Sequence, residues 1–230
     1  MKKHGKKYVD AAKKAPQGAV SVAEAVAFVK ANAFAKFDES VELGMRMGCD
    51  PRKSDQMIRG TVSLPHGTGK DVRVVVFAGG AAAEAAKAAG AIEAGTDELL
   101  EKIKGGWMDF DVAIATPEAM TAVRKLARVL GPRGLMPNPK TGTVTDDVAS
   151  AVTAQKAGKV EFRMDRQGNI CVLVGKRSFD ADKLVGNIKA IVSAVQAAKP
   201  ATVKGVFIKS MTISSTMGVG VPVVLTSDAE

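Results

Sequence analysis

The chain has 230 residues, 46% of them hydrophobic and 25% charged, which is the balance of a folded globular protein and excludes a largely disordered one. Its 33 Lys and Arg against 24 Asp and Glu give a formal net charge of +9, which favours a polyanionic partner such as nucleic acid or an anionic membrane. A solvated basic surface that only keeps the protein soluble explains this charge equally well. No apolar run approaches the roughly 18 residues that span a bilayer, and no signal-peptide core follows the basic start, so we expect a soluble, cytoplasmic protein without a membrane partner.

The few cysteines and histidines exclude several kinds of site. Cys49 and Cys171 are far apart and outside any C-x-x-C pair, which argues against a disulfide scaffold or a thiolate metal site. His4 and His66 have no neighbouring cysteines or carboxylates in the arrangement of a zinc site. The sequence therefore predicts neither a bound metal nor a cofactor.

In chain order, the first third predicts one helix and two strands. Ser21–Ala31 has the apolar spacing of an amphipathic helix. Phe37–Met47 alternates apolar and polar side chains with the period of a half-buried strand, and Ile58–Leu64 follows as a second strand.

The middle third alternates strands and helices. Its strands are short, continuously apolar runs rather than alternating ones, which is typical of a parallel sheet covered by helices on both faces. The helix that Thr116-Pro117-Glu118 opens, with Pro at its first position, carries its apolar face on Met120, Val123, Leu126, Ala127 and Leu130. The predicted elements are a strand at Val72–Phe77, a helix from Gly80 to Ala89, a helix capped at Thr96 and ending at Lys104, a strand at Asp111–Ala115, the helix after Thr116, and a helix at Asp146–Ala157.

The last third again predicts an antiparallel arrangement. Val160–Met164 and Ile170–Val174 flank Asp165-Arg166-Gln167-Gly168-Asn169, which is a strong signal for a hairpin turn. A long helix at Asp180–Ala198 and an alternating strand at Phe207–Ser214 follow.

The two outer thirds are predicted to form one domain together, since neither has enough strands for a good sheet alone. Residues 1–66 carry 12 Lys and Arg against 7 Asp and Glu, residues 67–158 carry 11 of each, and residues 159–230 carry 10 against 6. All the positive excess therefore lies in the outer segments, where a polyanion would dock. We expect a split α+β two-layer domain, 1–66 plus 159–230, with a parallel α/β domain, 67–158, inserted through connections near Leu64–Gly69 and Ala157–Val160 that act as a hinge.

The inserted domain lacks the motifs of a nucleotide-binding enzyme. Gly79-Gly80-Ala81-Ala82 has no second spaced glycine of a dinucleotide fingerprint, and Gly69-Lys70 is followed by Asp71 rather than by the Ser or Thr of a phosphate loop. Two histidines offer no nucleophile–base pair. We therefore expect no enzyme activity. A nucleotide-dependent enzyme is the disfavoured alternative, and a basic adaptor that binds protein is a third.

Three stretches combine residues in a way that a purely structural role does not require. In Ala35–Ser40, Lys36 and Phe37 suit a phosphate contact beside a stacked base or ribose, although a core role for Phe37 has about equal weight. In Thr212–Val221, hydroxyls and glycine amides suit contacts with phosphates and 2′-hydroxyls, and the alternative is a strand end with its turn. Gly131–Lys140 is rich in Pro and Gly, which predicts a fixed exposed loop that either touches nucleic acid or only connects elements.

These stretches also carry a resemblance to a known family. Lys36-Phe37-Asp38-Glu39-Ser40, Ile58-Arg59-Gly60-Thr61-Val62, Leu64-Pro65-His66-Gly67, Gly131–Lys140, Lys156–Arg163 and Ser214–Val221 resemble, in order and spacing, the bacterial large-subunit ribosomal proteins numbered one. The resemblance covers essentially the whole chain. It implies a split α+β domain with a Rossmann-like insert, a monomer off the ribosome, and the mobile stalk of the large subunit. Its implied partners are large-subunit ribosomal RNA, the exit-site transfer RNA whose release the family assists, and the messenger RNA of its own operon, which it represses.

The same resemblance implies which residues touch RNA. Shape recognition with few base-edge contacts is the mechanism we expect. The RNA-binding candidates are Lys36, Phe37, Ser40, Glu42, Ser210, Thr216, Met217 and Gly218. Weaker candidates for phosphate contacts are Arg52, Lys53, Arg163 and Arg166, of which Arg166 in the hairpin turn is the least secure.

Overall fold

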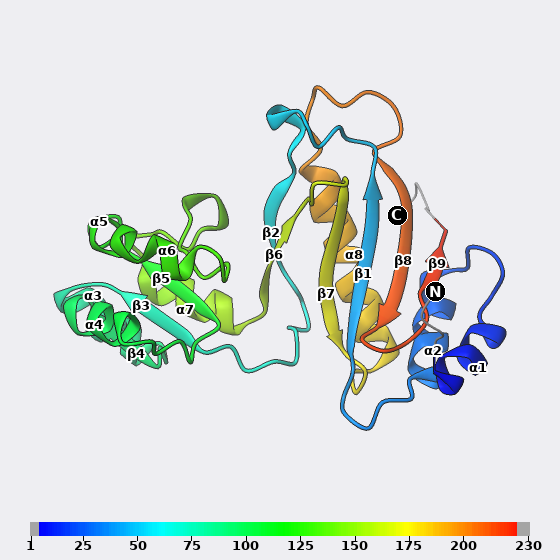
Figure 1. The fold of residues 1–230 in the computed structure, drawn as a ribbon, viewed down its shortest axis with the longest axis horizontal. Helices are drawn as coiled ribbons and strands as arrows, with labels where there is room; N and C mark the ends of the chain where they lie inside the picture. Colours follow the sequence, from blue (N-terminus) through cyan, green and yellow to red (C-terminus); the bar gives the residue numbers. More distant parts are fainter. Residues whose placement is uncertain (1–4, 225–230) are drawn as a thin grey trace. The chain divides into compact units, whose positions relative to one another are not determined.

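The computed structural model describes residues 5–224, which form two compact units (Figure 1). The first, called the split unit here, comprises Met1–Gly69 and Val160–Glu230, and the second, called the insert, comprises Lys70–Lys159. These divisions lie within three residues of the boundaries predicted from charge and pattern. His4, one of the residues considered above as a metal ligand, lies outside the described residues.

The split unit is built on a four-stranded antiparallel sheet in the order β7-β1-β8-β9. Its strands are β1 (Ser40–Met47), β7 (Asn169–Lys176), β8 (Ile208–Ser215) and β9 (Val221–Val223). A separate two-stranded sheet pairs β2 (Arg59–Ser63) with β6 (Lys159–Arg163). The helices are α1 (Lys6–Lys14), α2 (Val22–Asn32) and α8 (Ala181–Ala197), with a short 3₁₀ turn η1 (Ser54–Gln56).

One face of the four-stranded sheet is covered and the other is open. The inward residues Val41, Leu43 and Met45 of β1 join one apolar core with Val26 of α2 and Ile188 of α8. In Figure 1, α8 lies behind β7, β1 and β8, and no described helix lies in front of these strands. The alternation of β1 therefore sends every second side chain to the open face.

Local sequence signals explain where α2 begins and how the first connection leaves the split unit. Ser21 and Glu24 form a reciprocal capping box, which satisfies two free amides at the start of α2. The fully buried amide of Asn187 on α8 donates to the carbonyls of Gly67 and Val174 and accepts from the N–H of His66. The bonds to His66 and Gly67 fix the chain on α8 just before it enters the insert, and the bond to Val174 ties α8 to β7.

The hairpin predicted for Val160–Val174 is wrong in its pairing. The turn itself forms, since the Asp165 carboxylate accepts from the N–H groups of Gln167 and Asn169, each at 2.8 Å. Beyond the single bridge Met164↔Ile170, however, β6 pairs with β2 and β7 pairs with β1. β2 accommodates β6 because Gly60 has no side chain: a Cβ there would come within 2.6 Å of the Phe162 ring.

The insert is a three-stranded parallel sheet in the order β4-β3-β5, as the alternating pattern predicted. One apolar core lies between the sheet and α4, α5 and α6, and another between the sheet and α3 and α7, so helices cover both faces. This arrangement confirms the doubly wound α/β class. The elements are β3 (Val74–Phe77), α3 (Gly80–Ala88), β4 (Glu93–Gly95), α4 (Asp97–Lys104), β5 (Val112–Ala115), α5 (Met120–Val123), η2 (Arg124–Leu126), α6 (Ala127–Leu130), η3 (Pro139–Thr141) and α7 (Val148–Lys156).

Several local predictions for the insert need correction. The helix expected from Pro117 begins at Met120 and is interrupted by η2, although the Thr116 hydroxyl accepts from the N–H of Ala119 as an N-cap residue does. Ala127, expected on its apolar face, is exposed. Thr96 precedes α4 without a side-chain cap, whereas Asp147 does cap α7 through the N–H of Ser150.

Candidate nucleic-acid interface

The open face of the four-stranded sheet carries most of the predicted RNA contacts. On β1, Ser40, Glu42, Gly44 and Arg46 alternate with buried residues and point to this face. The register places Glu42 opposite Ser214, Gly44 opposite Thr212 and Arg46 opposite Ser210 on β8. The open face therefore carries hydroxyl groups along the whole length of β8, which suit phosphate and 2′-hydroxyl partners.

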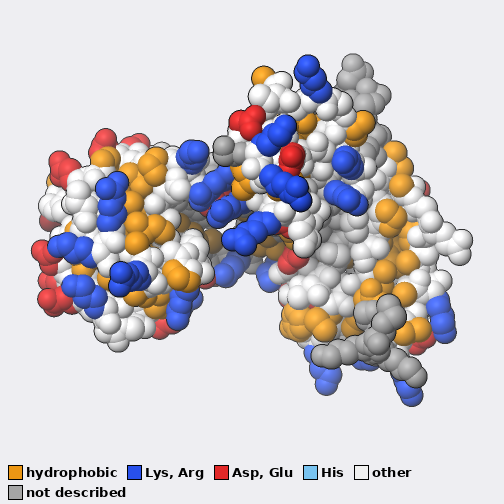
Figure 2. Space-filling model, turned by 45° about the horizontal axis from the view of Figure 1, so that its top comes forward, with side chains coloured by type: hydrophobic (Ala, Val, Ile, Leu, Met, Phe, Trp, Pro, Cys, Tyr) orange, Lys and Arg blue, Asp and Glu red, His pale blue; other side chains and the backbone are white. Residues whose placement is uncertain are grey.

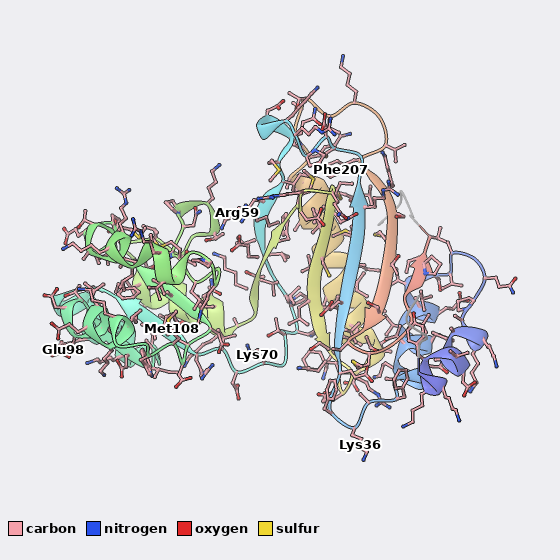
Figure 3. The ribbon with its side chains drawn as sticks, viewed as in Figure 1. Lys36, Arg59, Lys70, Glu98, Met108 and Phe207 are labelled. Atoms are coloured by element: carbon pink, nitrogen blue, oxygen red, sulfur yellow. The ribbon has the colours of Figure 1, made fainter. Side chains whose placement is uncertain are left out.

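Ser210 and the start of β1 lie at different ends of this face. Ser210 pairs with Arg46 near the end of β1, whereas Ser40 and Glu42 lie at its beginning. Figure 3 shows the same separation, with Lys36 at one end of the sheet and Phe207, just before β8, at the other. The predicted residues thus form an extended surface rather than one compact pocket.

At the beginning of β1, Ser40 and Thr216 are bonded to each other. The Thr216 hydroxyl accepts from the N–H of Ser40 at 3.0 Å, and the N–H of Thr216 donates to the Ser40 carbonyl at 3.0 Å. Lys176 donates to the Ser40 hydroxyl, also at 3.0 Å. The two stretches singled out in the sequence, Ala35–Ser40 and Thr212–Val221, therefore meet here.

The carboxylate of Glu39 also links the loop before β1 to the turn after β8. This carboxylate is fully buried and accepts from the N–H of Ala35 at 2.9 Å and from the N–H of Met217 at 3.2 Å. Burial alone raises the pKa of Glu39, but the Ser215 side chain, these two N–H donors and the positive charge of Arg177 outweigh it and lower the pKa below its usual value. Glu39 is therefore charged at neutral pH and holds the loop before β1 against the turn after β8.

The motif Lys36–Ser40 divides into exposed and structural residues. Phe37 is 54% exposed and Met217 is 52% exposed, so the alternative of a core role for Phe37 is wrong. Asp38 accepts from the backbone and the hydroxyl of Ser178 and fixes the loop to the chain after β7. Asp38 and Glu39 hold the backbone, while Lys36 and Phe37 face solvent.

The weaker candidates gather near the other end of β1. Arg52, Arg163 and Arg166 line a depression of about 590 Å³ together with the half-exposed Met57. Lys53 is exposed beside Arg52 but does not line it. In Figure 2, Lys and Arg side chains crowd the upper part of the larger unit, whose far side that view leaves hidden. Such a cluster suits the backbone of a nucleic acid.

Sequence reasoning missed other polar groups of the open face. Arg46 lies opposite Ser210, and Cys171 of β7 donates to the Glu42 carboxylate at 3.6 Å. The alternation of β1 was visible in the sequence, but which strands pair with β1 was not. Pairing register was the missing information.

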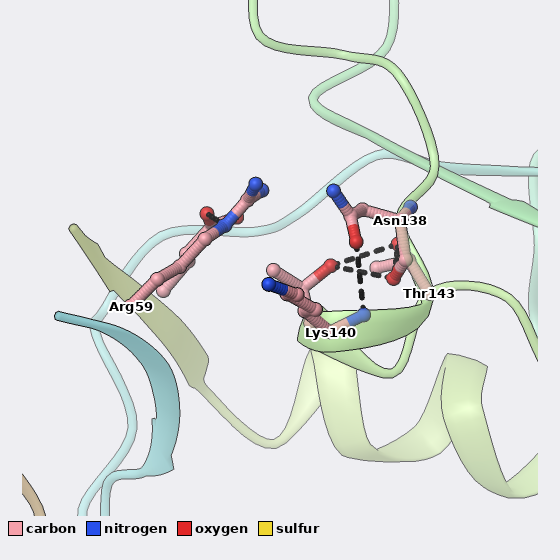
Figure 4. Close-up of polar contacts among 6 residues, drawn as sticks. Arg59, Asn138, Lys140 and Thr143 are labelled. Carbon is pink, nitrogen blue, oxygen red and sulfur yellow. Dashed lines mark hydrogen bonds and ion pairs between the residues drawn. The ribbon is translucent and has the colours of Figure 1, made fainter. Parts of the chain in front are cut away.

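The Gly131–Lys140 loop of the insert is held from within, as its composition predicted. The backbone N–H of Asn138 donates to the Thr143 hydroxyl at 2.8 Å, and the Asn138 side chain accepts from the N–H of Lys140 at 2.9 Å (Figure 4). Thr141 adds a hydroxyl bond to the Asn138 carbonyl at 2.9 Å. Arg133 and Lys140 are exposed on this fixed loop.

No group of three or more His, Cys, Asp or Glu side chains in residues 5–224 has the arrangement of a metal site. Within the same residues, no helix has the length and apolar character needed to cross a bilayer.

Comparison with known proteins identifies the family. Residues 29–219 match the model of the ribosomal protein L1p/L10e family. The chain is 54% identical to the large ribosomal subunit protein uL1 of Mycobacteroides abscessus over 97% of its own length and 95% of that protein. It is 57% identical to uL1 of Salinispora arenicola over 87% and 84%, and 54% identical to uL1 of Corynebacterium glutamicum over 97% and 95%. The chain therefore belongs to the ribosomal protein L1p/L10e family, and as a large-subunit protein of the cytoplasmic ribosome it binds RNA and is not an enzyme.

Proposed function

We propose that the split unit holds large-subunit ribosomal RNA on a surface we call the RNA face. The RNA face consists of Lys36, Phe37, Ser40, Glu42, Ser210, Thr216, Met217 and Gly218. The observation that carries this proposal is the joining of the loop before β1 to the turn after β8 through Ser40, Thr216 and Glu39. That frame leaves two large apolar side chains, Phe37 and Met217, exposed beside hydroxyls and Lys36.

The chemistry of the RNA face suits an irregular RNA better than a regular helix. Exposed apolar side chains stack on unpaired bases or on ribose, and hydroxyls and backbone amides bond to phosphates and 2′-hydroxyls. The basic cluster of Arg52, Lys53, Arg163 and Arg166 adds attraction for the phosphates, without sequence readout. We assign it a supporting role on the same RNA.

The resemblance to the family supports further proposals for the remaining parts. We propose that the protein is a monomer off the ribosome and forms the mobile stalk on it, where it assists movement and release of the exit-site transfer RNA. The insert, with Arg133 and Lys140 on a fixed loop, is the part we assign to the transfer RNA. We further propose that the RNA face binds the messenger RNA of the protein's own operon and represses its translation.

Affinity measurements with matched variants test the RNA face. The full chain is titrated with the fragment of large-subunit ribosomal RNA that it protects from ribonuclease. Phe37→Ala and Met217→Ala should each weaken binding by about 1–3 kcal/mol, the range for a lost stacking contact. Ile92→Ala removes a side chain of the insert that is 50% exposed and should bind like the parent. Unchanged affinity in both RNA-face variants contradicts the proposal.

A further inference from the structure

A second depression of the split unit lies directly beside the RNA face. Its volume is about 560 Å³, within the range of small-molecule sites. The turn after β8 forms one wall with Met217 and Gly218, and the start of α1 forms another. The wall from α1 consists of Lys6, Lys7 and Tyr8, and Phe34 closes the depression between the two walls.

The lining of this depression has two chemical characters. Tyr8, Phe34 and Met217 supply two rings and a thioether, while Lys6 and Lys7 supply exposed ammonium groups. The chain has only one Tyr and eight Phe, so two rings beside one exposed Met mark a concentration of a scarce residue class. Aromatic faces next to cations are the combination that binds a base together with its phosphate.

The depression shares its frame with the RNA face. Met217 belongs to both, and its N–H is held by the carboxylate of Glu39. Phe34 precedes Ala35, whose N–H is the other donor to the same carboxylate. A nucleotide in the depression and an RNA on the RNA face would therefore contact adjoining parts of one rigid frame.

The start of α1 lies outside residues 29–219, the part of the chain that the family model covers. The match begins at residue 29, whereas α1 spans Lys6–Lys14. Ala11 is the buried anchor of this helix, and its first turn holds Lys6, Lys7 and Tyr8. The N-terminal helix thus adds a wall from outside the residues that the family model covers.

We propose that this depression takes one unpaired nucleotide of the RNA bound at the RNA face. The base lies against Tyr8, Phe34 and Met217, and Lys6 and Lys7 hold its phosphate. The inference rests on the proposed function, because the nucleotide belongs to the RNA that the RNA face holds. Charge complementarity selects this occupant over a neutral one. An acidic peptide would satisfy the lysines as well, and the experiment separates the two.

A single fluorine label reports on the depression. Tyr8 is the only Tyr of the chain, so growth with 3-fluorotyrosine gives one ¹⁹F resonance. Adding the ribonuclease-protected fragment of large-subunit ribosomal RNA should shift this resonance, and polyglutamate at the same charge concentration should not. A resonance that stays in place while gel shift shows bound RNA overturns the inference and leaves the proposed function standing. A shift with polyglutamate alone also overturns it, and absence of RNA binding refutes the proposed function itself.

Conservative variants give an independent readout in the full chain. Tyr8→Ala should weaken RNA binding about tenfold, whereas Tyr8→Phe, which keeps the ring, should stay within about twofold of the parent. Lys6→Gln should lower the slope of log affinity against log salt by about one, because one phosphate contact is lost. Lys14→Gln, on the same helix but not lining the depression, should leave the slope unchanged. Equal affinity of Tyr8→Ala and the parent, with equal slopes for both lysine variants, overturns the inference.

Discussion

The carboxylate of Glu39 accepts a hydrogen bond at 3.2 Å from the backbone N–H of Met217, a residue 178 positions further along the chain. The other carboxylate oxygen accepts from the N–H of Ala35. A buried charge is stable only where such donors surround it, so the two segments and the carboxylate require one another. Glu39 therefore positions the loop that carries Lys36 and Phe37 relative to the turn that carries Met217.

Replacing this carboxylate tests its positioning role. Glu39→Gln puts an amide nitrogen opposite one of the two N–H donors, and we expect RNA affinity to fall about tenfold, equivalent to about 1.4 kcal/mol. The salt slope of binding should not change, because no phosphate contact is removed. Titration at several salt concentrations measures both quantities.

A matched control separates positioning from a change of net charge. Glu98→Gln changes the charge equally at an exposed site on α4, shown in Figure 3, and should bind RNA like the parent. If Glu98→Gln weakens binding as much as Glu39→Gln, net charge and not position explains the loss. A changed slope with Glu39→Gln also contradicts a positioning role.

The hydroxyl of Thr216 allows a prediction about side-chain chemistry. This hydroxyl accepts from the N–H of Ser40, so Thr216→Ala leaves that donor without its partner at the start of β1. We expect RNA affinity to fall by about 1–3 kcal/mol. Thr216→Ser keeps the hydroxyl and should retain most of the affinity. Equal affinities for the Ala and Ser variants in a filter-binding titration would remove the hydroxyl from the site.

Removing the insert tests the division of labour between the units. We expect a chain in which a short Gly/Ser linker replaces Lys70–Lys159 to bind the ribosomal RNA fragment within a few-fold of the parent. The reason is that the core of the split unit contains no residue of the insert. Circular dichroism establishes whether the shortened chain folds. If the shortened chain folds but no longer binds the RNA, the insert and not the split unit supplies the main RNA contacts.

The insert has a pH-dependent ion pair at Asp111. Lys70 lies 2.7 Å from its carboxylate and Arg73 lies 3.0 Å away. Burial alone raises the pKa of Asp111, but these hydrogen-bonded cations lower it to about 2 from a usual value of 3.8. A lowered pKa stabilises the folded insert above pH 3.8, and this stability is lost as the pH falls toward 2.

Asp111→Asn should therefore destabilise the insert only at higher pH. At pH 7 we expect the free energy of unfolding to fall by about 1 kcal/mol, since the exposed partners and solvent screening reduce the effect of the pKa shift. Near pH 2 the variant and the parent should be equally stable. Urea unfolding followed by the fluorescence of Trp107, the only Trp of the chain, measures this difference within the insert. Asp109→Asn, at an 81% exposed carboxylate 4.0 Å from Arg73, is the control and should change little.

The sequence determined the periodic and compositional features of this protein. Alternation in β1 predicted which side chains share a face, because each second residue of a strand points the same way. Continuous apolar runs predicted the parallel sheet of the insert, since strands buried on both faces carry few polar residues. The charge of the outer segments and the Lys36–Ser40 motif pointed to RNA and to the family.

Tertiary structure alone decided which distant segments meet. The Val160–Val174 pattern gave a turn but not the partners of β6 and β7, because turn residues fix local backbone direction and not the packing of Phe162 over Gly60. The register of β1 with β8 and the bonds of Glu39 to Met217 join residues far apart in sequence. Local propensity cannot specify such contacts. They form where burial of the shared apolar core and satisfaction of buried polar groups are achieved together.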